Sequence, residues 1–300
     1  MNFDELLTER VNPASRDIET RSTVEILQII NQEDQKIAGA VAAEISRLAE
    51  AVDAVVNVIR KDGRLFYIGA GTSGRLGVLD AAECPPTFHV SPELVQGIIA
   101  GGEAALARAT EATEDDPAAG KRDLMAREFT ARDALVGIAA SGRTPYVLGA
   151  VAAARELGAL TIGVSCTPDS ELSRAVKIAI TPLVGPEVIA GSTRMKAGTA
   201  TKLVLNMLST AVMIRLGYVY GNLMVNVEPK NSKLADRAKR IIAESAGVNY
   251  EQAGHLLDQS AGNVRVAIVM SRLAIDREAA QARLAAAGGR VAEALQAVKE

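Results

Sequence analysis

The chain has 300 residues, of which 48% are hydrophobic but only 3% aromatic, so aliphatic side chains must fill its core. The net charge of −3, with no basic stripe that alternates with aromatic residues, argues against a nucleic-acid partner. The two cysteines, Cys84 and Cys166, are far apart in sequence and indicate a reduced, intracellular setting. The acidic N-terminus lacks an apolar signal segment, and the longest apolar helix, near residues 203–216, contains Asn206 and Arg215. We therefore expect a soluble cytoplasmic protein without a membrane segment.

The first elements predicted along the chain are helices. Residues 22–25 have the pattern of a capping box, which opens a helix after a polar, irregular start. Between residues 45 and 59 apolar residues recur at spacings of three and four, as on one face of a helix. Basic residues in the last turn and Gly63 just beyond it are typical of a helix end.

The middle of the chain alternates short apolar runs with helical segments, which predicts an α/β fold with a doubly wound parallel sheet. The predicted strands are residues 65–68, 96–100, 134–139, 160–164 and 176–180. The predicted helices between them are residues 75–83 (ended by Pro85 and Pro86), 103–113, a helix after Pro117, and 145–157, with the long apolar helix after residue 201. Beyond residue 231 only helices are expected, so we divide the chain into a sheet domain with N-terminal helices, residues 1–230, and a small helical domain, residues 231–300.

The loop after the first predicted strand, residues 69–74, matches the pattern GxGxxG of dinucleotide-binding proteins. An NAD site also needs an acidic residue at the end of the next strand, whereas Glu93 precedes that strand. Thr72 and Ser73 moreover place two hydroxyl groups inside the pattern. A second Ser-Gly-Arg sequence at residues 141–143 again follows a strand and precedes a helix. Main-chain N–H groups at a helix start, together with hydroxyl groups, favour a phosphate monoester over a dinucleotide.

These two loops resemble the phosphate-binding loops of sugar isomerase (SIS) domains. The resemblance rests on residues 71–73 and on residues 139–144, and it implies that Ser141 and Thr144 bind phosphate with Thr72 and Ser73 nearby. One departure is Ala139, which stands where the usual loop has a serine and so removes one hydroxyl group.

Four longer segments, residues 8–13, 69–77, 80–88 and 191–199, resemble the signature of N-acetylmuramic acid 6-phosphate etherases, and the resemblance extends over nearly the whole chain. It implies a homodimeric lyase of amino-sugar catabolism and cell-wall recycling that uses no metal or other cofactor. The substrate implied is N-acetylmuramic acid 6-phosphate, and the products are N-acetylglucosamine 6-phosphate and D-lactate. The two functional carboxylates of the family match Glu83 and Glu114.

Taken by themselves, three of the charged residues allow a second interpretation. Glu83 lies at the expected end of a helix, where the dipole opposes a carboxylate and favours its acid form, but it could equally be an exposed surface residue. Glu114 lies in an acidic run that could simply be solvated. Lys196, ahead of the long helix, could be solvated, but we assign it to the anion site, where it would steady the phosphate. The resemblance favours the functional interpretation of both glutamates.

Two alternatives to an etherase stay open. Because the glucokinase regulatory protein shares some of these segments, the chain could be a non-catalytic SIS module that senses a sugar phosphate; an NAD-dependent enzyme is the weaker alternative. The spacing along the chain raises a further question, since Glu83 lies nine residues beyond Gly74, about 13 Å along a straight helix. Either this helix turns early, or Glu83 serves a site that a partner subunit completes.

Overall fold

The computed structural model describes residues 7–108 and 114–296, which divide into two compact units. The first unit comprises residues up to 82 together with 92–209, and the second comprises residues 83–91 and 210–300. We predicted a helical domain from residue 231, which is the N-cap of helix α10. The compact units divide earlier in the chain, inside helices α4 (Gly71–Phe88) and α9 (Lys196–Leu216).

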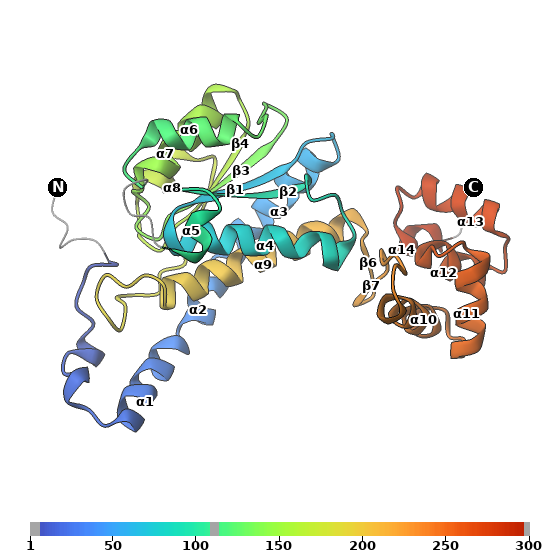
Figure 1. The fold of residues 1–300 in the computed structure, drawn as a ribbon, viewed down its shortest axis with the longest axis horizontal. Helices are drawn as coiled ribbons and strands as arrows, with labels where there is room; N and C mark the ends of the chain where they lie inside the picture. The colour runs from blue at the N-terminus through green and yellow to red at the C-terminus, as the bar shows by residue number, and fades with distance from the viewer. Residues whose placement is uncertain (1–6, 109–113, 297–300) are drawn as a thin grey trace. The chain divides into compact units, whose positions relative to one another are not determined.

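The first unit is built on a five-stranded parallel sheet in the order β2-β1-β3-β4-β5 (Figure 1). Its strands are β1 (Leu65–Gly69), β2 (Val95–Ile99), β3 (Ala134–Ile138), β4 (Leu160–Val164) and β5 (Ile178–Ile180). All five strands lie within two residues of their predicted positions, and the parallel pairing confirms the predicted fold class. The strand order is the flavodoxin-like 2-1-3-4-5 rather than the 3-2-1-4-5-6 order of dinucleotide-binding folds, which disfavours the NAD alternative.

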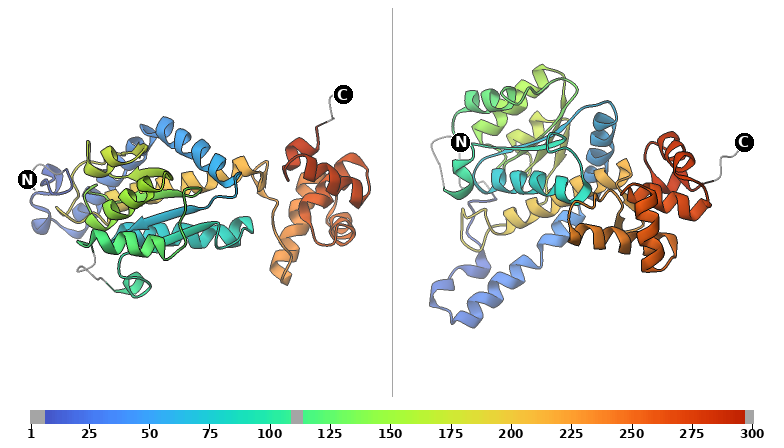
Figure 2. Two further views of the ribbon diagram at one scale, coloured as in Figure 1. Left: turned by 90° about the horizontal axis from the view of Figure 1, so that it is seen from above. Right: turned by 45° about the vertical axis from the view of Figure 1, so that its right-hand side comes forward.

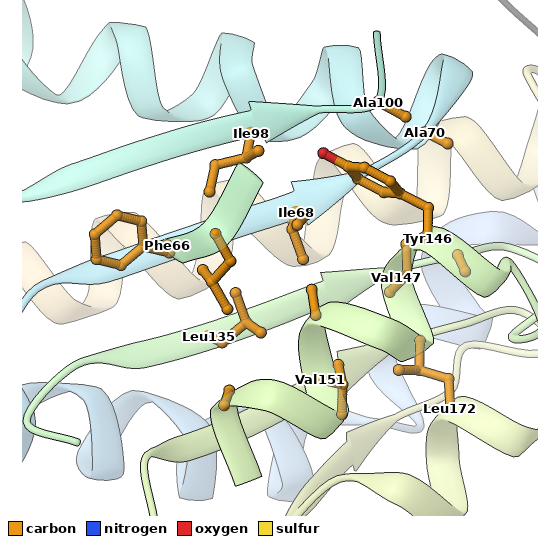
Figure 3. Packing of buried hydrophobic residues seen from close by; sticks show 14 of the residues in the cluster. Phe66, Ile68, Ala70, Ile98, Ala100, Leu135, Tyr146, Val147, Val151 and Leu172 are labelled. Carbon is orange, nitrogen blue, oxygen red and sulfur yellow. The ribbon is translucent and has the colours of Figure 1, made fainter. Parts of the chain in front are cut away.

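Helices cover both faces of this sheet. On one face Phe66 and Leu135 of the sheet share a core with Val147 and Val151 of helix α7 and Leu172 of helix α8, from which water is excluded (Figure 3). The helices of this face are α6 (Pro117–Met125), α7 (Pro145–Glu156) and α8 (Glu171–Ala175). The helices of the opposite face are α3 (Ile45–Ile59), α4 and α9, preceded by α1 (Thr23–Asp34) and α2 (Ile37–Ala42).

The second unit has its own core, to which helices α10 to α14 contribute; these helices are coloured orange to red in Figure 2. Its helices are α10 (Ser232–Ala246), α11 (Tyr250–Gln259), α12 (Val264–Leu273), α13 (Arg277–Ala286) and α14 (Val291–Ala294). A two-stranded antiparallel hairpin, β6 (Val219–Tyr220) with β7 (Leu223–Met224), precedes them and was not predicted. Each of its strands has only two residues, too few for an alternating pattern to be detected in the sequence.

Three predicted helices differ from the structure. The helix predicted to end before Pro85 continues as α4 to Phe88, with both prolines inside it. The helix predicted over residues 103–113 is only α5 (Ala104–Ala107) in the described residues, and residues 109–113 lie outside them. Helix α9 is long and apolar enough by composition to cross a membrane, contrary to our prediction, but 56% of its apolar stretch is buried inside the protein, as in a core helix.

Candidate active site

The sheet topology brings the two hydroxyl-bearing loops together. From β1 the chain turns to β2 on one side, whereas β3 continues to β4 on the other, so the order reverses between β1 and β3. Ligands of open parallel sheets bind beyond the carboxyl ends of the strands at such a reversal. Gly69, the last residue of β1, is paired in register with Ile138, the last residue of β3. The loops that follow these two residues therefore start from neighbouring strands, about 5 Å apart.

The first loop leads directly into helix α4. Gly71, the first residue of α4, has a left-handed φ of 51°, which favours glycine. A methyl group at this position would lie 3.3 Å from Oε1 of Glu114, so the Glu114 carboxylate lies against the first turn of α4. Thr72 and Ser73 in the same turn are half-buried. The structure thus brings Glu114 to the predicted Thr72–Ser73 loop, at the positive end of a helix that favours negative charge.

The second loop is held in shape by Gly142, whose φ is 67°. A methyl group on Gly142 would lie 2.3 Å from Cβ and Oγ of Ser170, so only glycine fits this position. Ser141 accepts a hydrogen bond from the main-chain N–H of Arg143 (3.3 Å), and Thr144 is the N-cap residue of α7. Both hydroxyl-bearing residues are half-buried, at the start of a helix. Backbone and hydroxyl donors are therefore grouped as an oxyanion of a ligand requires.

The main chain connects Glu114 to the second loop as well. The N–H of Tyr146, two residues beyond Thr144, donates a hydrogen bond to the main-chain oxygen of Glu114 (3.0 Å). Asp116 then caps helix α6 by accepting a hydrogen bond from the N–H of Ala119 (3.0 Å). One carboxylate and two hydroxyl-bearing loops are thus fixed to one edge of the sheet.

Glu83 lies on helix α4 and is exposed. Because α4 runs unbroken to Phe88, Glu83 is five residues from the end of the helix. We expected Glu83 in the last turn, where the helix dipole disfavours a carboxylate, and it does not lie there. The missing N–H groups of Pro85 and Pro86 remove two hydrogen bonds but leave the helix intact, contrary to the prediction. The last turn is closed instead by the N–H of His89, which donates to the main-chain oxygen of Pro85 (2.9 Å).

Lys196, which we assigned to the anion site, has a different arrangement in the structure. Its side chain is only 1% exposed, and Nζ donates to Oε2 of Glu33 at 2.6 Å. The two N–H groups that start α9, those of Lys196 and Ala197, donate to the carboxylate of Glu187, both at 2.9 Å. Because its charge is already compensated in a buried pair, the geometry does not support Lys196 as a ligand of the substrate.

Glu33 and Asp80 are buried carboxylates of the first unit that were not predicted. Glu33 accepts hydrogen bonds from Lys196 and from Asn12, whose side-chain nitrogen lies 2.9 Å away. Asp80 accepts hydrogen bonds from the hydroxyl of Tyr67 (2.9 Å) and from Asn206 (2.6 Å), which ties α4 to β1 and α9. Both carboxylates have a partner on α9 that is far away in sequence. Lys196 is 163 positions from Glu33, and Asn206 is 126 positions from Asp80, so no local pattern could reveal these pairs.

A cavity of about 800 Å³ opens elsewhere in the first unit, beside the edge strand β2. Its walls include Ile98, Leu106, Arg122 and Tyr146, and the described lining residues include none of the hydroxyl-bearing residues of the two loops. We place the candidate site at the loops rather than in this cavity, because the loops combine hydrogen-bond donors with a carboxylate at the reversal of strand order.

Several known proteins are similar to this chain in sequence. Residues 47–155, which include both loops, match the family of the glucokinase regulatory protein N-terminal SIS domain. The N-acetylmuramic acid 6-phosphate etherase of Caldanaerobacter subterraneus is 51% identical over 99% of this chain and 97% of its own length. The enzyme of the same name from Pasteurella multocida is 52% identical over 98% of both chains.

Solved structures support the fold alone. A putative phosphosugar isomerase from Bacteroides fragilis has a TM-score of 0.51 at 20% identity and covers 67% of this chain and 95% of its own. A phosphoheptose isomerase from Neisseria gonorrhoeae has a TM-score of 0.50 at 17% identity and covers 64% of this chain and 99% of its own. The structural similarity to these two proteins confirms the SIS-like fold that the resemblance implied.

Proposed function

This chain belongs to the N-acetylmuramic acid 6-phosphate etherase family, and from this premise we propose that it is an enzyme that cleaves the D-lactyl ether of N-acetylmuramic acid 6-phosphate. The products are N-acetylglucosamine 6-phosphate and D-lactate. The observation that carries the proposal is the identity of 51–52% over nearly the whole length of this chain and of its relatives. The grouped loops at the strand reversal supply a site for the phosphate.

The phosphate of the sugar is assigned to the starts of α4 and α7. Thr72 and Ser73 offer hydroxyl groups in the first loop, and Ser141 and Thr144 offer them in the second. Main-chain N–H groups in the first turn of a helix have no partner within the helix and attract an anion. Binding at this remote group orients the sugar carbons for reaction, which lowers the entropic part of the barrier.

A plain alkyl ether resists hydrolysis, so the reaction needs an activating step. Opening of the sugar ring gives an aldehyde at C1, which acidifies the proton on C2. A carboxylate removes this proton, the C3–O bond breaks, and the lactate oxygen takes a proton from an acid. Water then adds to C3 of the unsaturated aldehyde, and C2 receives a proton. One base and one acid are required, as a pair of carboxylates with different surroundings can provide.

We assign Glu83 as the proton donor and Glu114 as its partner, the base. The position of the Glu114 carboxylate against Gly71 supports this division, because the positive end of α4 favours the ionised form that a base needs. Glu83 is exposed on the same helix, where it is open to contact with a partner subunit.

The oligomeric state and the location in the cell are part of the proposal. We infer a cytoplasmic homodimer with its active site near the subunit interface. In support, α4 runs unbroken from Gly71 to Phe88, so the helix does not turn early between Gly74 and Glu83, as a partner-completed site would require. Exposed apolar side chains on α1, Val24 and Leu27 at 64% and 61%, offer surface that a second subunit could cover.

A sensor of sugar phosphates is the second candidate, favoured by the match to the glucokinase regulatory protein domain. The decisive experiment is incubation of the purified protein with N-acetylmuramic acid 6-phosphate and an assay for released D-lactate. We expect stoichiometric lactate and N-acetylglucosamine 6-phosphate, and no lactate from unphosphorylated N-acetylmuramic acid. Tight binding of the phosphorylated sugar without any lactate would establish the sensor instead.

A further inference from the structure

The sequence Ser-Gly-Arg occurs in both loops, but the two arginines have different surroundings. In the first loop, Nε of Arg75 donates to the main-chain oxygen of Leu106 (3.1 Å), and Nη2 donates to that of Arg108 (3.4 Å). In the second loop Nε of Arg143 is buried, and among the residues that the structure describes it has no hydrogen-bond partner. Nor does any carboxylate of the described residues form an ion pair with Arg143. Arg75 is thus satisfied within the protein, whereas Arg143 is not.

The position of Arg143 makes this lack of partners more costly. Arg143 directly precedes Thr144, the N-cap of α7, and the residue is partly buried. A buried donor without an acceptor loses its hydration without compensation. In the free protein this loss is unfavourable, and a negatively charged group bound beside Arg143 would offset it.

The backbone that carries Arg143 is held firmly. The N–H of Gly142 donates to the main-chain oxygen of Ala139 (2.8 Å), and the main-chain oxygen of Gly142 accepts from the N–H of Leu172 (2.9 Å). Gly142 is packed against Ser170 as well. The loop therefore cannot shift freely to give Arg143 a partner within the protein, and Arg143 belongs to the same short loop as the hydroxyl-bearing residues Ser141 and Thr144.

We propose that Arg143 is a substrate-binding residue whose guanidinium pairs with an anionic group of the bound sugar. The inference rests on the proposed function, whose substrate carries two such groups, the 6-phosphate and the carboxylate of the lactyl ether. A guanidinium binds either one through two parallel N–H···O bonds. Pairing with the carboxylate would make Arg143 a determinant of specificity, because only the substrate, and not the product sugar, carries that group.

The test compares Arg143→Gln and Arg143→Lys with wild type. The matched control is Arg155→Gln, because Arg155 is an exposed arginine in the last turn of α7. Turnover is measured on N-acetylmuramic acid 6-phosphate, and binding of N-acetylglucosamine 6-phosphate is measured by calorimetry. We expect Arg143→Gln to lower kcat/KM by about 10- to 100-fold, the effect of losing a charged hydrogen bond. Arg143→Lys should recover part of this loss, and Arg155→Gln should match wild type.

The two measurements identify the anion. If Arg143→Gln weakens binding of the product sugar to the same extent, the partner is the phosphate; if only turnover of the lactyl ether suffers, the partner is the carboxylate. A melting temperature of ligand-free Arg143→Gln equal to or above that of wild type is also expected, because an uncompensated charge has been removed. Unchanged kcat/KM and unchanged product affinity, or a melting temperature several degrees lower, would overturn the proposal. Wild-type protein that releases no lactate would refute the etherase function separately, and the product-binding arm would still test Arg143.

Discussion

The main-chain oxygen of Tyr146 lies so close to Gly120 that a methyl group on Gly120 would stand 1.9 Å from it. The contact has a counterpart one turn along, where a methyl group on Gly149 would lie 2.0 Å from the main-chain oxygen of Pro117. These two glycines let α6 and α7 approach closely. Glu114 lies three residues before α6, and Thr144 immediately precedes α7. The close packing of the two helices therefore helps to set the position of Glu114 relative to the second hydroxyl-bearing loop.

Alanine at either glycine should push the helices apart. We expect Gly120→Ala and Gly149→Ala each to destabilise the protein by about 1–3 kcal/mol, the usual cost of overpacking, and to lower kcat. Gly39→Ala is the matched control, since Gly39 is an exposed glycine in helix α2 with no atom near its added methyl group, and this change should raise stability by up to about 1 kcal/mol. Urea unfolding and steady-state kinetics measure both effects. Variants at Gly120 and Gly149 with wild-type stability and kcat would show that the helices tolerate separation.

Replacement of the carboxylates tests the assigned acid and base. Glu83→Gln and Glu114→Gln should each lower turnover by about 10² or more, the contribution of a positioned acid or base. Affinity for the phosphorylated sugar should change far less, because the loops that bind phosphate are intact. Near-normal turnover of either variant in the lactate assay would remove that residue from the mechanism.

Ser141→Ala should have the opposite signature, a weaker affinity for the phosphorylated sugar in an intact fold.

Mixing of inactive subunits then tests the homodimer. If Glu83 and Ser141 of different subunits form one site, an equal mixture of Glu83→Gln and Ser141→Ala subunits restores about a quarter of wild-type activity, because half of the dimers have one intact site. Each variant alone stays inactive at the substrate concentration used. A mixture as inactive as its components, after demonstrated exchange of subunits, would place both residues in the same subunit's site.

The pH dependence of stability should report on Glu33. Burial by itself would raise the pKa of Glu33, but hydrogen bonds from Lys196, Lys36 and Asn12 outweigh burial and lower the pKa from 4.5 to about 2. A carboxyl whose pKa is lower in the folded protein stabilises the fold above its unfolded pKa, near 4.5. This stabilisation is lost as the pH falls from 4.5 toward 2.

Glu33→Gln should therefore lose about 3–5 kcal/mol at neutral pH, because Lys196 is left buried without its partner. Between pH 4.5 and pH 2 its stability should change less than that of wild type. The control is Glu50→Gln, since Glu50 is an exposed residue paired with Arg47 and should be nearly neutral. Parallel curves of stability against pH for wild type and Glu33→Gln would contradict the assignment.

Isotope labels identify the bond that breaks. In ¹⁸O-labelled water, elimination followed by hydration places the label on the C3 hydroxyl of the product sugar and leaves lactate unlabelled, because the C3–O bond is the one cleaved. In deuterated water, C2 of the product should gain deuterium. Mass spectrometry of both products measures these labels. Label in the lactate with none at C3 would mean direct displacement at the lactyl carbon, with the substrate assignment unchanged.

The sequence predicted those features that depend on local patterns. Every strand of the sheet was located, because buried strands of a parallel sheet are short continuous apolar runs, such as residues 65–69. The capping box of α1 at Ser22 and Glu25 was predicted and is present. Both hydroxyl-bearing loops follow strands, as expected. What failed depends on tertiary contacts: the buried pair of Lys196 with Glu33 joins residues 163 positions apart.

The end of α4 shows a further limit of local rules. Two consecutive prolines predicted a break, but the helix continues to Phe88, where Asn226 donates hydrogen bonds to the main-chain oxygens of Phe88 (2.7 Å) and His89 (3.2 Å). The support for the last turn thus comes from a residue more than 130 positions away, which no window along the sequence includes.

That support has a consequence for any shortened form of the protein. Residues 83–91 and 210–300 form one compact unit, so the turn that carries Glu83 folds with the C-terminal helices although it is encoded in the first third of the chain. A fragment of residues 1–209 would retain all five strands and both phosphate loops, yet it would lack Asn226 and the hydrogen bonds that close α4. Such a fragment should keep the sheet and its two hydroxyl-bearing loops, while Glu83 is left on a helix whose last turn has lost these hydrogen bonds. If Glu83 is the proton donor that we propose, the segment that carries Asn226 is then needed for catalysis and is not a removable appendage.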